Sequence, residues 1–236
     1  MALPSQSTPI YTLTIPSTGK KVNFRPFLVK EEKSLLLAQQ SEDIGTMTTT
    51  LKSIISSCIK DDINVDNLAV FDIEYIFTQI RAKSIGESVS LIFTCKHCEN
   101  ENNKVKLDID LTKIEVVKDP SHTNKINLFD DVGVIMKYPT LDIIKNSEGK
   151  IDDISSVIDI VIDCIDVIYN NEELFYTKEQ NRAEVEEFVM NLTKKQFDLI
   201  EQFFVTVPKF KQDIEFDCPA CGEHNKSVLE GPQSFF

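Results

Sequence analysis

Four of the six cysteines form two CxxC pairs, Cys95 with Cys98 and Cys218 with Cys221. A spacing of two residues lets the chain turn tightly enough for both sulfurs of a pair to face one metal ion. Together the pairs supply four thiolates, the tetrahedral ligand set of a structural Zn²⁺ site. The sequence therefore predicts a zinc site made of these four cysteines. Because such a site leaves no position open for water or substrate, we expect the zinc to be structural.

Other interpretations of the two pairs stay open. They could be separate, metal-free turns, or a redox dithiol, although neither pair has the helix N-terminus and βαβ context of a thioredoxin-like motif. His97 and His224 could each replace a cysteine as ligand. We expect neither histidine to bind the metal, because four cysteines already complete the site. Gly222 suits the positive φ that the turn after a pair requires, and Asn100, after the first pair, tolerates the same region.

The remaining chemistry-bearing residues nominate no catalytic site. Cys58 and Cys164 lie in apolar patterns typical of a core. The Asp-rich stretch 152–166 lacks the glycine and closing glutamate of a calcium loop, so it predicts a solvated helix face. The sequence contains no HExxH, GxSxG or GxGxxG motif, and we expect the protein not to be an enzyme.

Alternating apolar residues place each cysteine pair at the tip of a predicted β-hairpin. Residues 89–93 and 105–111 alternate on either side of the first pair, and 214–217 and 227–229 flank the second. The two pairs are separated by residues 99–217, which is 119 residues. A metal ion that joins them would close a long loop, where a cross-link gains most in chain entropy.

The other segments predict further hairpins and helices. Residues 11–24 indicate a hairpin, and 126–136 indicate a strand pair. Spacing and capping signals predict helices at 30–38, at 47–58, from Asp66-Asn67 as a cap to Gly86, after Pro139-Thr140, over 151–169, and after capping boxes at Thr177 and Thr193, the last ending near Pro208. The stretch 151–169 is ambiguous because its β-branched residues favour a strand, and the face shared by its aspartates decides for a helix.

The sequence thus predicts an α+β fold with a mostly helical body, short β-hairpins and a split four-cysteine zinc ribbon. We expect an N-terminal hairpin with helices over 1–87, the two zinc-ribbon hairpins over 88–112 and 212–230, and a mainly helical insert over 113–211. With 236 residues, of which 42% are hydrophobic, the chain can bury cores in one large or two small domains.

Composition narrows the classes of partner. Lys and Arg number 25 against 38 Asp and Glu, a formal net charge of −13. This charge disfavours nucleic acid as the main partner, because phosphate binding needs clustered cations. The N-terminus lacks the basic start and apolar core of a secretory signal, and no apolar run approaches the ~18–20 residues that span a bilayer. We therefore expect no membrane span and a reducing compartment, where cysteines are thiols or metal ligands.

Two stretches carry a resemblance to a known family. They are YTLTIPSTGKKVNFRPFLVKEEKSLLL at 11–37 and FDIEYIFTQIRAKSIGE at 71–87. The chain resembles the baseplate hub and hub-assembly protein family of T-even-like contractile-tailed bacteriophages, and the paired CxxC hairpins fit that family. The resemblance implies a non-enzymatic structural or assembly protein of the tail baseplate hub, with other phage hub or tail proteins as partners. It implies a location in the virion tail baseplate, in the host cytoplasm during assembly, or in both.

The sequence also leaves an alternative function and a candidate contact. A zinc-ribbon regulator that binds nucleic acid or a polymerase would present basic, aromatic-bearing hairpin loops, but 99–103 and 222–226 are neutral or acidic in balance. An enzyme that uses unrecognised residues is a third hypothesis. Phe235 and Phe236, apolar and terminal after Gly231-Pro232, form either a frayed end or an arm that inserts into a partner.

Overall fold

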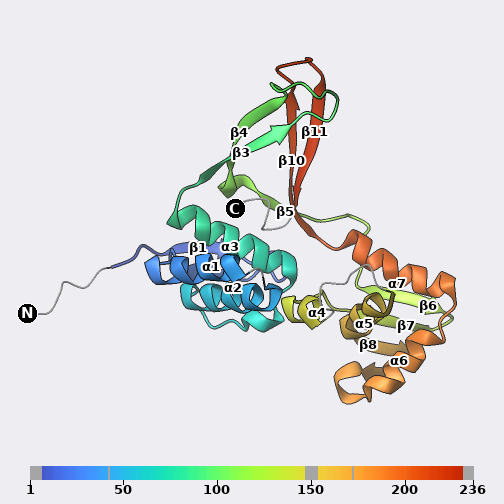
Figure 1. The fold of residues 1–236 in the computed structure, drawn as a ribbon. Coiled ribbons are helices and arrows are strands. Elements are labelled where there is room, and N and C mark those ends of the chain that lie inside the picture. The colour runs from blue at the N-terminus through green and yellow to red at the C-terminus, as the bar shows by residue number, and fades with distance from the viewer. Residues whose placement is uncertain (1–6, 42, 147–153, 172, 231–236) are drawn as a thin grey trace, which may run out of the picture. The chain divides into compact units, whose positions relative to one another are not determined.

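The computed structural model describes residues 7–41, 43–146, 154–171 and 173–230, and these fold as two compact units (Figure 1). Unit 1 takes in the described residues up to Val65, Phe71–Val117, and those from Lys209 onward. Unit 2 takes in Asp66–Val70 and the described residues of Lys118–Pro208. Within the described ranges, none of the helices has the length and apolar character needed to cross a bilayer. Both units combine helices with antiparallel strands that come in separate runs along the chain, so the α+β class is confirmed.

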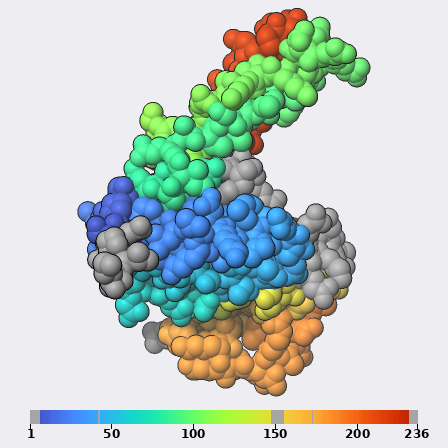
Figure 2. Space-filling model, turned by 60° about the vertical axis from the view of Figure 1, so that its left-hand side comes forward, coloured from blue at the N-terminus to red at the C-terminus, as the bar shows by residue number. Residues whose placement is uncertain are grey.

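The N-terminal part of unit 1 is a hairpin with three helices. Strands β1 (Tyr11–Thr14) and β2 (Lys21–Phe24) pair antiparallel, as predicted. Helices α1 (Val29–Ser41), α2 (Ile44–Cys58) and α3 (Val70–Ser84) follow, and the outer faces of α1 and α2 reach the surface (Figure 2, blue). The predicted apolar faces of α2 and α3 are buried at Leu51, Ile54, Ile55, Cys58, Ile73, Ile76, Phe77 and Ile80.

The N-terminal ends of α2 and α3 differ. The Asp43 carboxylate accepts a hydrogen bond from the Thr46 backbone N–H at 2.6 Å and caps α2. The predicted cap of α3 at Asp66-Asn67 is wrong, because both residues lie in the short 3₁₀ helix η1 (Val65–Asn67). Helix α3 begins at Val70, so neither residue occupies the position directly before it.

A buried ion pair ties the first hairpin to α1. The Arg25 guanidinium lies 2.9 Å from a Glu31 carboxylate oxygen, and the two side chains are 9% and 7% exposed. The other Glu31 oxygen accepts the Leu28 backbone N–H at 2.7 Å, at the start of α1. Burial opposes ionisation of Glu31, but Arg25 and that N–H lower its pKa.

The rest of unit 1 is built from two predicted hairpins that lie side by side (Figure 1, green and red). Strands β3 (Ser88–Thr94) and β4 (Lys104–Asp110) form the first, and β10 (Lys209–Asp217) and β11 (His224–Glu230) form the second. Phe93 and Phe216 pack between them, with ring centroids 5.8 Å apart. The short helix η2 (Leu111–Lys113) follows β4.

A third strand closes the base of the second hairpin. Strand β5 (Glu115–Val117) pairs antiparallel with β10, and Val117 lies directly opposite Lys209. These two residues are the last before unit 2 and the first after it. The long insertion therefore leaves and re-enters the ribbon through neighbouring strands.

Unit 2 is less helical than predicted, because its centre is a four-stranded antiparallel sheet. The strands are β6 (Lys125–Phe129), β7 (Val132–Met136), β8 (Ile165–Asn170) and β9 (Glu173–Tyr176), in that spatial order. The helical elements are α4 (Leu141–Asn146), α5 (Ile154–Cys164), η3 (Thr177–Glu179), α6 (Arg182–Met190) and α7 (Lys194–Thr206). Both the mainly helical insert and the mostly helical body are therefore overstated.

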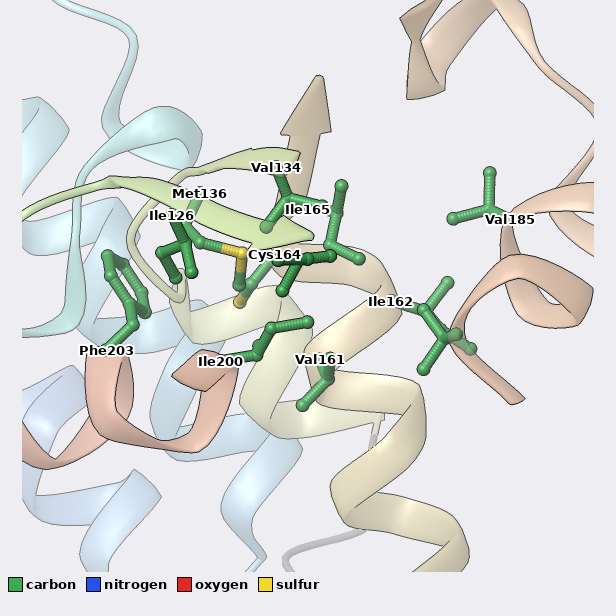
Figure 3. Close-up of a cluster of buried hydrophobic side chains, with 12 residues drawn as sticks. Ile126, Val134, Met136, Val161, Ile162, Cys164, Ile165, Val185, Ile200 and Phe203 are labelled. Atoms are coloured by element: carbon green, nitrogen blue, oxygen red, sulfur yellow. The ribbon is translucent and has the colours of Figure 1, made fainter. Parts of the chain in front are cut away.

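The core of unit 2 lies between this sheet and its helices (Figure 3). It includes Val134, Met136, Val161, Cys164, Ile165 and Ile200. Gly133 on β7 allows a close approach of β6 and β8, because a Cβ atom there would lie 2.2 Å from both the Ile126 carbonyl oxygen and the Tyr169 hydroxyl. The Tyr169 hydroxyl donates to that carbonyl at 3.1 Å. Glycine is thus required at this position by packing.

Two sequence predictions in unit 2 are corrected. The helix predicted over 151–169 ends at Cys164, and Ile165–Asn170 is strand β8, because its backbone pairs with β7 on one side and β9 on the other and its β-branched residues suit a strand. Residues 151–153 lie outside the described residues. The predicted capping box at Thr177 is wrong, since its hydroxyl donates to the Ile165 carbonyl at 2.7 Å. The box at Thr193 is confirmed, with reciprocal bonds to Gln196.

Candidate metal centre

The two hairpins bring their cysteine pairs together at their tips. The sulfur atoms of Cys95, Cys98, Cys218 and Cys221 all lie within 4.8 Å of one another. Cys95 Sγ lies 3.8 Å from Cys221 Sγ, and Cys98 Sγ lies 3.8 Å from Cys218 Sγ. A tetrahedron with Zn–S bonds of about 2.3 Å has edges of about 3.8 Å, whereas a disulfide needs about 2.05 Å. The spacing therefore suits a four-coordinate metal ion, and both short distances cross from one hairpin to the other.

Glycine shapes the turn of the second pair, as predicted. Gly222 has a φ of +76°, and its N–H donates to the Cys218 carbonyl at 2.9 Å. The Cys218 N–H donates in turn to the Glu223 carbonyl at 2.9 Å. A side chain at position 222 would strain the left-handed backbone although nothing lies within 4 Å of its Cβ position. These two backbone hydrogen bonds lie within the turn and close it.

The turn of the first pair is built differently. Among the described residues, the positive φ angles outside glycine fall at Asp130 and Asn171, so the left-handed conformation suggested for Asn100 is wrong. Asn103, only 9% exposed, holds this turn, because its side-chain amide donates to the Cys98 carbonyl and its own carbonyl accepts the Cys95 N–H, both at 2.9 Å. A buried amide thus replaces the glycine of the second turn.

A second asparagine joins the two turns. Asn225 on β11 is 2% exposed, and its side-chain oxygen accepts the Lys96 backbone N–H at 3.0 Å. Its amide nitrogen donates to Cys95 Sγ at 3.4 Å and to the Glu223 carbonyl at 2.9 Å. Sequence reasoning missed both Asn103 and Asn225, because a buried asparagine has no spacing signature of its own. The second hairpin therefore positions a cysteine of the first.

The environment of Cys95 favours its thiolate. Burial opposes ionisation, but the His97 backbone N–H at 3.3 Å, the Asn225 amide and the neighbouring thiols together lower its pKa to about 6. Four sulfurs within 4.8 Å cannot all carry a negative charge without strong mutual repulsion. The cluster is thus arranged for a cation that neutralises several thiolates at once.

Neither neighbouring histidine belongs to the group of described side chains that could hold a metal ion. The His224 Nδ1 atom lies 2.8 Å from an Asp217 carboxylate oxygen, and its Nε2 lies 3.7 Å from Glu215. His97 is exposed at the surface of the first turn. Among the described residues, the group of side chains placed to hold one metal consists of the four cysteines.

The two cysteines outside the pairs lie in hydrophobic cores. Cys58 and Cys164 are fully buried, and burial raises their pKa values to about 11 and about 12, as expected for core thiols. Phe235 and Phe236 lie outside the described residues.

Comparison with known proteins places the chain in a family. The profile of a family described as T4 bacteriophage base plate protein matches residues 8–236. The chain is 25% identical over 227 residues to the "Baseplate hub assembly protein gp26" of Enterobacteria phage T4, and the match covers 96% of this chain and 97% of that protein. No solved structure matches. A profile match over nearly the whole length shows that this chain belongs to the T4 bacteriophage base plate protein family.

Proposed function

We propose that this chain is a non-enzymatic structural or assembly protein of the phage tail baseplate hub. Family membership and the name of its T4 relative, a baseplate hub assembly protein, support this role. It would act through contacts with other baseplate hub or tail proteins, in the virion baseplate, in the host cytoplasm during assembly, or in both. The exposed glutamates at the ribbon tip, Glu99, Glu101 and Glu223, favour this role over a nucleic-acid regulator, because they would repel phosphates.

We further propose that Cys95, Cys98, Cys218 and Cys221 hold one structural Zn²⁺. The observation that carries this proposal is the pair of 3.8 Å sulfur–sulfur distances between the hairpins. Four thiolates in tetrahedral order select Zn²⁺ or iron, and a closed site of this kind commonly holds Zn²⁺ without catalysis.

The metal would cross-link the two hairpins at the end opposite to the β5–β10 pairing. The pairing of β5 with β10 holds the base of the second hairpin, where unit 2 leaves and returns, and the metal would hold both hairpin tips. The Phe93–Phe216 contact and the Asn225 bonds also join the two hairpins, and the metal would add to them. Zinc would therefore make the split ribbon a rigid platform for partner contacts.

Phage genetics tests the proposed function. A phage whose copy of this gene is deleted should form no complete baseplate hubs in electron micrographs of infected cells. Complementation with wild-type protein should restore them, and Cys95→Ser or Cys218→Ser should fail to do so. His97→Ala is the matched control, because it lies between two ligands and is exposed.

The two parts of the proposal fail separately. If the deletion phage assembles normal hubs, the hub role is wrong. If the deletion abolishes hubs but the cysteine variants restore them fully, the metal is dispensable. Removal of residues 232–236 tests the proposed C-terminal arm with Phe235 and Phe236. The shortened chain should bind its hub partner more weakly without unfolding.

A further inference from the structure

An apolar groove lies on the helical side of unit 2. It measures about 520 Å³ and is bordered by α5, the C-terminal end of α6 and α7. Its lining is formed by Val157, Ile158, Val189, Met190, Leu192 and Phe197, with Lys194 and Glu201 at its polar edge. This volume is in the range of about 300–1,000 Å³ that ligand pockets of proteins span.

The groove combines a rigid floor with an adaptable rim. Val189 is buried in the core of unit 2, and Ile158, Leu192 and Phe197 pack against that core. Met190, the last residue of α6, is 61% exposed. A flexible, polarisable methionine next to an open apolar hollow is typical of a surface that adapts to an inserted partner.

Acidic groups dominate the surroundings of the groove. Lys194 at its edge is already paired with Asp198 at 2.7 Å and with Glu201 at 2.9 Å. Glu186 is exposed one turn before Met190 and therefore lies on the same side of α6. The sequence ranges of unit 2 hold nine basic and nineteen acidic residues, so −10 of the net charge of −13 belongs to this unit.

We propose that this groove binds a basic amphipathic helix of another baseplate protein. Its apolar side chains would enter the groove, as in helix-in-groove recognition, and its flanking Lys or Arg side chains would meet carboxylates such as Glu186. Charge complementarity selects this occupant, because a second copy of the same acidic unit would be repelled and so would a nucleic acid. The identity of the partner as a baseplate protein rests on the proposed function.

The test uses purified full-length chain and the phage hub proteins co-expressed with it. Met190→Glu removes an apolar contact and introduces a charge that would lose its hydration when an apolar side chain covers it, while Glu186→Lys reverses a rim charge. Val205→Glu and Glu173→Lys are matched controls, because both change exposed residues of unit 2 outside the groove. The Kd for the hub partner should rise at least about 30-fold in the groove variants, as for loss of an interface hot spot. The two control variants should bind the partner like wild type.

Genetics adds a second readout. Phage that carry Glu186→Lys should plate poorly, and second-site revertants should change a Lys or Arg of one hub protein to an acidic residue. The inference is overturned if the groove variants bind and plate like wild type, if the controls are equally impaired, or if Met190→Glu abolishes self-association of the purified chain instead. Since the deletion phage reports on the hub role by itself, a failure here leaves that role intact.

Discussion

Asn225 should determine how tightly the centre holds zinc, although it is not a ligand. Asn225→Ala removes the bonds to Lys96, Cys95 and Glu223, while the four sulfurs stay in place. At about 1 kcal/mol for each lost hydrogen bond, the change costs about 2–3 kcal/mol. That energy corresponds to a loss of about 30- to 150-fold in zinc affinity, close to the 10- to 100-fold typical of groups that support metal ligands.

Chelator competition at neutral pH measures this loss directly. Asn225→Asp should bind zinc more weakly than Asn225→Ala, because it loses the donor to Cys95 and adds a negative charge beside the thiolates. Asn102→Ala is the control, since Asn102 is exposed in the same region and contributes its backbone N–H to Asn100. If Asn225→Ala binds zinc within about threefold as tightly as wild type, a binding free-energy difference well under 1.4 kcal/mol, the proposed role of Asn225 is refuted.

Three other predictions concern the rest of the fold. Replacing residues 118–208 by an Asn-Gly turn should leave a folded unit 1 that binds one zinc, because Val117 and Lys209 are paired on neighbouring antiparallel strands. Metal analysis and circular dichroism of the shortened protein check this prediction. A shortened protein without metal would contradict it. Glu31→Ala should cost about 3 kcal/mol in denaturant unfolding because it strands a buried Arg25, whereas Lys194→Ala in an exposed pair should cost less than about 1 kcal/mol. Burial lowers the pKa of His122, so the native state favours its neutral form, and the free energy of unfolding should fall as the pH drops below the ordinary histidine pKa of 6.5. His122→Gln should flatten this decline in stability. An unchanged dependence of stability on pH in that variant would exclude His122 as its source.

The cysteine site was predictable because its signal is local and chemical. Two CxxC pairs and their flanking alternation specify two hairpin tips, and the structure brings these tips together across residues 99–217. Asn225 was not predictable, since its role depends on a contact with the other hairpin. Spacing within one segment carries no information on such a contact.

The middle of the chain shows where periodicity fails. Residues 154–170 contain a helix and a strand in succession, and their β-branched residues fit both. The boundary at Cys164 is set by β7 and β9, which pair with β8 on either side. Tertiary packing thus decides what local preference leaves undecided.

X-ray absorption at the zinc edge, on full-length protein purified without chelator, tests the central claim most directly. We expect about one zinc per chain with four sulfur neighbours at about 2.3 Å, reduced in content by Cys95→Ser and by Cys218→Ser but not by His97→Ala. Nitrogen neighbours at about 2.0 Å would assign a histidine to the site. A well-folded protein that contains no zinc would contradict the account.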